Sequence, residues 1–134
     1  MAKGYEQNQE RQQALAFLGK GLARRARSKC ELTLASGVPL VIYEVAPVPA
    51  EPDIERCLFI SESARDQLVK PAGFRPEQWR HLNELVWSDL PVVQVMALRI
   101  LRFLDGNHPW ARQILEDFYP DPDIDAWADA VPLA

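Results

Sequence analysis

The stretch that decides the fold is Trp79–Ala128, WRHLNELVWSDLPVVQVMALRILRFLDGNHPWARQILEDFYPDPDIDAWA. Its most apolar part, residues 90–104, repeats apolar side chains at the three- and four-residue spacing of one helix face. Gln94, Arg99 and Arg102 fall together on the opposite side of the same helical wheel. The pattern predicts a core helix with one solvent-facing stripe.

Capping signals divide this stretch into several helices. Ser88 and Asp89 precede the core helix as N-cap candidates, and Asp105-Gly106-Asn107 is a typical helix stop. We expect further helices to begin near prolines, since proline suits the first helical turn, and these prolines are Pro76, Pro109 and Pro122. With a small helix after Ser61, they predict a helical block over residues 61–130. Core and inter-helix packing is the expected use of its four tryptophans, Trp79, Trp87, Trp110 and Trp127.

An amphipathic helix is also predicted at the amino terminus, over residues 7–28. Leu15, Leu18 and Leu22 recur at helical spacing, and basic residues gather toward the carboxyl end, where they oppose the helix dipole. Gly19 and Gly21 each cost about 1 kcal/mol relative to Ala in a helix, so a bend or break is possible there.

Residues 30–60 change from a helical to an extended pattern. Val38–Val45 is rich in β-branched and aromatic residues and follows the turn signal Ser36-Gly37, so a short hairpin is predicted. Prolines make residues 47–52 an extended loop, after which Cys57–Ile60 is a second strand candidate. The predicted fold is therefore α+β and mainly α: a long N-terminal helix, a small ribbon-like β-hairpin region, and a C-terminal block of about four helices.

The length and composition of the chain indicate what kind of protein to expect. A chain of 134 residues, 48% hydrophobic and 25% charged, has the size of one soluble domain covering residues 1–134. No apolar run reaches the roughly 20 residues that span a bilayer, and the first residues are too polar for a secretion signal. We therefore expect a cytoplasmic protein without a membrane partner, in which Cys30 and Cys57 stay reduced.

Charge is distributed unevenly along the chain. Residues 11–29 contain a basic cluster that is a possible contact patch, formed by Arg24, Arg25, Arg27 and Lys29, while the carboxyl-terminal residues are acidic. The net charge of −4 and the lack of interleaved aromatic residues do not favour nucleic acid. The two ends of the chain are instead expected to face each other or a neighbouring copy.

Several segments together resemble the amino-terminal region of the PhnA family, the alkylphosphonate utilisation proteins. They are SKCEL, VIYEV, a lone Cys before a short helix, WRHLNELVWSDLPVVQVMALRILRFL, and WARQILEDFYPDPDIDAWA. The resemblance covers about residues 22–129. It implies a small zinc ribbon packed on helices and followed by a separate β-barrel-like domain, which we expect this chain, ending at Ala134, to lack.

In the family that the chain resembles, two C-x-x-C knuckles supply four thiolates to a tetrahedral zinc ion. Here the knuckle positions read Cys30 and Thr33 in the first and Cys57 and Ile60 in the second, so each has lost one cysteine. Thr is a very poor zinc ligand and Ile is none. We therefore expect no cofactor, with apolar packing against the helices replacing the metal.

His81 and His108 are the only imidazoles that could complete a Cys₂His₂ site, but neither has knuckle or i, i+4 spacing. The sequence contains no G-x-S-x-G, Walker or H-E-x-x-H motif. We therefore predict a non-catalytic module that binds a protein partner or itself. The alternatives are an accessory protein or enzyme of phosphonate metabolism, suggested by the resemblance alone, and a nucleic-acid-binding ribbon.

Overall fold

The computed structural model of the chain describes residues 2–79 and 81–133. It is an α+β fold that is mainly helical, as predicted. The α-helices are α1 (Ala2–Ala26), α2 (Glu62–Val69), α3 (Leu82–Leu85), α4 (Pro91–Leu104), α5 (Pro109–Asp117) and α6 (Pro122–Ala130). The strands are β1 (Leu40–Glu44) and β2 (Cys57–Ser61), and short 3₁₀ helices are η1 (Ile54–Arg56), η2 (Pro71–Gly73) and η3 (Pro76–Trp79).

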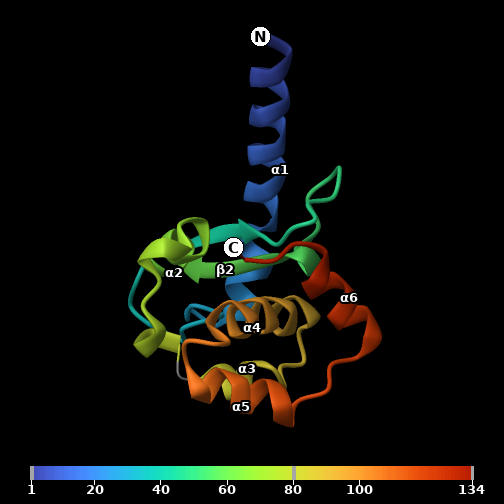
Figure 1. The fold of residues 1–134 in the computed structure, drawn as a ribbon. Coiled ribbons are helices and arrows are strands. Elements are labelled where there is room, and N and C mark those ends of the chain that lie inside the picture. Colours follow the sequence, from blue (N-terminus) through green and yellow to red (C-terminus); the bar gives the residue numbers. More distant parts are fainter. Residues whose placement is uncertain (1, 80, 134) are drawn as a thin grey trace.

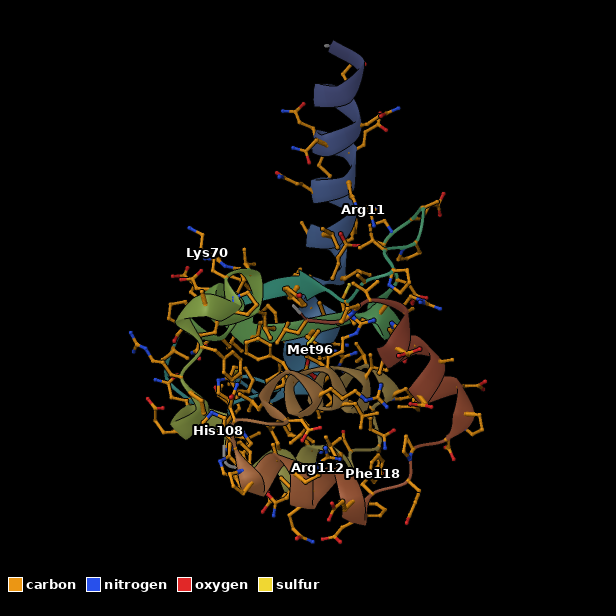
Figure 2. All side chains as sticks on the ribbon, in the orientation of Figure 1. Arg11, Lys70, Met96, His108, Arg112 and Phe118 are labelled. Carbon is orange, nitrogen blue, oxygen red and sulfur yellow. The ribbon has the colours of Figure 1, made fainter. Side chains whose placement is uncertain are left out.

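Helix α4 lies at the centre of the structure, between the two-stranded sheet and the layer of α3 and α5, with α6 along one side (Figure 1). Met96, near its middle, is buried at the centre of the body (Figure 2). Ten of the fourteen residues of α4 are buried. The predicted core helix is confirmed, and Gly106, with φ of +97°, lies just beyond its end where a left-handed conformation favours glycine.

Two expectations for α4 were wrong. Arg99 does not face solvent but is only 4% exposed, because carbonyl oxygens from other segments surround its guanidinium. Neither Ser88 nor Asp89 caps the helix: Leu90 is the N-cap residue and makes no side-chain capping bond. The Ser88 hydroxyl instead accepts a hydrogen bond from the Leu90 amide at 3.1 Å.

The sheet pairs β1 with β2 in antiparallel register, from Leu40 opposite Ser61 to Glu44 opposite Cys57. The proline-rich loop and η1 connect the two strands, so the hairpin is wider than the Ser36-Gly37 turn predicted. Ser36 instead pairs with Lys29 in a single bridge that encloses a turn over residues 30–35, and Gly37 follows this bridge. The Ser61 hydroxyl then accepts a bond from the Ala64 amide at 3.2 Å and caps α2, as predicted.

Helix α1 begins earlier and ends earlier than predicted, at Ala2 and Ala26. Arg27 and Ser28 follow in the left-handed region, with φ of 55° and 63°, which ends the helix. Gly21 does not break it; a Cβ there would lie 2.8 Å from Ile54 Cδ1, so glycine allows α1 to lie close to η1.

The helix predicted from Pro76 through Val86 is divided into η3 and α3. The Trp79 indole N–H donates to Gln67 Oε1 at 3.0 Å, and the same oxygen accepts from the Arg75 amide at 2.8 Å. This tertiary anchoring on α2 holds Trp79 fully buried, stacked on Phe74 at 5.0 Å.

Within residues 2–79 and 81–133, no helix combines the length and apolarity needed to cross a bilayer.

Candidate functional site

The first candidate region is the turn over residues 30–35, here called the first knuckle. The Thr33 amide donates to Cys30 Sγ at 3.4 Å, and the Leu34 amide donates to the Cys30 carbonyl at 2.9 Å. The Cys30 amide closes the turn on the Ala35 carbonyl at 2.9 Å. Leu34 takes a left-handed φ of 63°. The backbone thus folds around the sulfur although only one cysteine is present.

The electrostatics of Cys30 reflect this wrapping. Burial by itself raises the pKa of the Cys30 thiol, but a hydrogen bond with the Thr33 side chain and backbone hydrogen bonds at Ser61, Thr33 and Leu32 lower it. The combined effect brings the pKa below its ordinary value. Thr33 therefore serves as a hydrogen-bonding partner of the sulfur.

The second knuckle position has a different backbone. Cys57 and Ile60 both belong to β2, where residues three apart point to opposite faces and lie about 10 Å apart along the strand. An extended segment cannot wrap one ion from these two positions. Burial and the nearby Glu44 and Asp53 carboxylates raise the pKa of Cys57 to about 11, against the opposing effect of Arg25 and Arg11.

The two histidines lie in separate places. His81 Nε2 makes a short hydrogen bond with the Leu32 carbonyl of the first knuckle. His108 precedes α5, with its ring 5.9 Å from that of Trp110 (Figure 2). Across residues 2–79 and 81–133, no group of three or more His, Cys, Asp and Glu side chains is arranged to hold a metal ion. The two cysteines and two histidines that were weighed as a Cys₂His₂ site therefore form no such group among the described residues.

An ion pair fastens the end of α1 to the first knuckle. Arg25 Nε and Nη2 donate to the two Glu31 carboxylate oxygens, both at 2.8 Å. Arg25 also donates to the carbonyls of Ile54 at 3.0 Å and Cys57 at 2.6 Å. The Glu31 side chain, 4% exposed, accepts in addition from the Phe59 amide at 2.7 Å. One guanidinium thus joins α1, η1, the first knuckle and β2.

The predicted basic patch is therefore divided by function. Arg25 is committed to Glu31 and to backbone carbonyls, whereas Arg24, Arg27 and Lys29 are exposed. Sequence spacing alone could not separate Arg25 from its neighbours, because Glu31 becomes its partner only after the chain turns at Arg27 and Ser28.

Helix α1 extends away from the rest of the chain over its amino-terminal turns (Figure 1). Its inner face carries Arg11, Leu15, Leu18, Leu22 and Arg25, all partly or fully buried. Arg11 donates to both Glu44 carboxylate oxygens at 3.0 and 2.6 Å, and to the carbonyls of Pro49 and Ala50 at 2.9 Å each. Arg11 thereby fastens α1 across a cleft of about 690 Å³ beside residues 50–52 (Figure 2).

A row of residues on a second side of α1 is exposed from Glu6 to Arg24, and its member Glu10 also borders the cleft beside residues 50–52. We call this row the outer stripe, and it consists of Glu6, Glu10, Gln13, Phe17, Lys20 and Arg24. Successive members are three or four residues apart, which keeps them on one side of a helix. Phe17, which neighbours the apolar Leu18 in sequence, is 89% exposed. The charged residues on the same side of the helix, such as Lys20 and Arg24, were the sequence signal that Phe17 lies on an exposed face.

Other aromatic side chains are also exposed. Trp87 is 67% exposed and contacts Phe118 edge to face at 4.8 Å, so of the expected core and inter-helix packing, core packing is wrong for Trp87 while it does contact a residue that follows α5. Trp127 is partly buried, with Arg56 stacked 4.8 Å from its ring and its indole donating to the Ala46 carbonyl at 3.1 Å. Tyr119 is 88% exposed.

Comparisons with known proteins give no match: no protein-family model, no curated protein and no solved structure is similar to this chain at a significant level.

Proposed function

We propose that the chain is a non-catalytic interaction module, related to PhnA-type proteins through the resemblance of its sequence, in which zinc no longer supports the ribbon. Its partner is a protein or a second copy of itself, and α1 is the contacting element. The observation that carries the proposal is the outer stripe, where Phe17 is 89% exposed on a helix that projects from the body.

A projecting helix calls for an energetic explanation. Isolated helices shorter than about 12–15 residues are marginal in water, and most helical stability in proteins comes from packing of an amphipathic face. The inner face of α1 has such packing at Leu22 and weaker burial at Leu15 and Leu18. The first turns gain little from the body, so a partner on the outer stripe would stabilise them.

Features of the ribbon region support a structural use. The first knuckle is held by its own hydrogen bonds and by Glu31, which bonds to Arg25 and to the Phe59 amide. Leu32, Leu58 and Ile60 are fully buried and belong to the same core cluster as α4. Apolar packing of this kind supplies the folding free energy that a metal supplies in a zinc ribbon.

The specific alternatives draw less support. Of the basic cluster proposed for nucleic acid, Arg25 is occupied by Glu31, and the exposed stripe mixes cations with Glu6 and Glu10, which repel a polyanion. A role in phosphonate metabolism rests on the family resemblance alone, which is an argument from fold to function.

Photo-cross-linking inside the host cell tests the proposal. A photoreactive phenylalanine analogue is placed at position 17, on the outer stripe, and in a matched control at position 12, which is exposed on the flank of the same helix. We expect a discrete protein adduct from position 17 and none from position 12. Absence of an adduct from position 17, or equal adducts from both positions, would refute α1 as the contacting element.

A further inference from the structure

The charges on the outer stripe run in opposite senses along α1. Its amino-terminal half carries Glu6 and Glu10, and its carboxyl-terminal half carries Lys20 and Arg24, with Phe17 between them. The row is therefore complementary to itself when reversed. A parallel copy would set Glu10 against Glu10 and Arg24 against Arg24, which is repulsive.

We propose that α1 pairs in antiparallel fashion with α1 of a second copy, through the outer stripe, to form a two-fold symmetric dimer. The two-fold axis passes at Phe17, so the two phenyl rings meet each other. Residues equally far on either side then face one another: Glu10 of each copy lies opposite Arg24 of the other. The inference rests on the proposed function and names its partner.

Three features of the fold make this pairing geometrically suitable. The outer stripe is exposed on a different side of α1 from the inner face, with Glu10 bordering the cleft, so the stripe is open to a second helix while the body stays on the inner face. The stripe repeats at alternating three- and four-residue intervals, the spacing that keeps a seam facing a partner helix. A two-fold interface uses one self-complementary patch twice, which is the commonest symmetry of soluble oligomers.

The pairing also satisfies groups that a single copy leaves exposed. Phe17 loses its contact with water, and the first turns of α1 gain a neighbour along their length. Because one aromatic residue supplies the apolar contact and exposed ion pairs supply the rest, the dimer is weak and sensitive to salt. A polyanion or an anionic lipid surface would not provide a cation for Glu10.

Charge reversal tests the register. Sedimentation equilibrium of the full chain at about 0.05 M salt should show a species of twice the 15.2 kDa chain mass, dissociating as salt is raised. Glu10→Lys and Arg24→Glu each make both symmetric contacts repulsive, so each should weaken the dimer by about tenfold or more. The double variant Glu10→Lys/Arg24→Glu exchanges the two charges and should restore the dimer. Glu77→Lys, an equal charge change at an exposed position off α1, should leave it intact.

Two further experiments test the antiparallel register: mixing of the two charge-reversal variants, and disulfide cross-linking of cysteine variants. The two single variants, combined in equal amounts, should form a heterodimer, since each supplies the charge that the other lacks. Phe17→Cys should form a disulfide-linked dimer on oxidation, whereas Gln12→Cys on the flank should not; Cys30 and Cys57 are buried in both.

A wild-type chain that remains monomeric at about millimolar concentration would overturn the dimer, because a dissociation constant above that value is weaker than that of almost any specific complex. So would a dimer indifferent to the single reversals, or a double variant that stays monomeric. Photo-adducts from position 17 that contain a different protein would refute self-pairing while supporting the interaction module; absence of any adduct would refute the module itself.

Discussion

Replacing Arg25 with methionine is expected to destabilise the chain strongly. The substitution keeps an unbranched apolar stem and removes the guanidinium. Four hydrogen bonds are lost, two to Glu31 and one each to the Ile54 and Cys57 carbonyls. Glu31, whose side chain is 4% exposed, then retains only the Phe59 amide as a partner.

The magnitude follows from this burial. Breaking a buried ion pair by removing one partner costs about 3–5 kcal/mol, because a charge is left buried without compensation. The Arg25 side chain is 17% exposed, so water screens the site partly and the lower end applies. We expect the free energy of unfolding to fall by about 3 kcal/mol, a large part of the 5–15 kcal/mol typical of a domain.

Urea unfolding followed by circular dichroism measures this loss, run at a concentration where the chain is monomeric. The double variant Arg25→Met/Glu31→Leu removes both charges and should be less destabilised than the sum of the single changes, giving a coupling energy of about 2 kcal/mol. Arg65→Met is the control, since Arg65 pairs only with the exposed neighbour Asp66, and its change should stay within about 0.5 kcal/mol.

A loss below about 1 kcal/mol for Arg25→Met, or additive single and double changes, would refute the view that this pair fastens α1 to the first knuckle.

Further predictions concern the thiols, the buried arginine and metal. The pKa of the Cys57 thiol is raised from 9.0 to about 11 in the folded chain, so the thiol loses its proton at lower pH when the chain is unfolded. The free energy of unfolding should therefore fall as the pH rises between these two values. Urea titrations across this pH range should show a less steep fall for Cys57→Ser. Arg99→Met should lower the free energy of unfolding by about 3 kcal/mol, because three carbonyls at residues 46, 127 and 128 lose their donor; a change under about 1 kcal/mol would show that water replaces it. Equimolar zinc, or a chelator, should leave the thermal midpoint unchanged within about 1 °C, whereas a rise that increases with zinc concentration would reveal a site that stabilises the folded chain.

Local sequence patterns were sufficient for much of the fold. The apolar repeat over residues 90–104 produces α4, and Ser61 caps α2, because helical periodicity and capping depend on neighbours within a few positions. β-Branched and aromatic residues likewise produce β1, and the short apolar run Cys57–Ile60 produces β2. The presence of a single cysteine at each predicted knuckle position also reads directly from the sequence, and the structure adds that Cys57 lies in an extended strand.

Tertiary structure decided the positions whose partners are distant in the chain. Arg99 occupies a polar position on the helical wheel, yet the carbonyl of Ala46 and those of the adjacent Trp127 and Ala128 surround it and satisfy its charge in the interior. Trp87 and Phe17 have large apolar side chains, yet they are 67% and 89% exposed, because the rest of the described chain leaves most of their surface uncovered. A wheel or a propensity describes one element alone, whereas burial depends on which other elements arrive beside it, and that is fixed only when the whole chain packs.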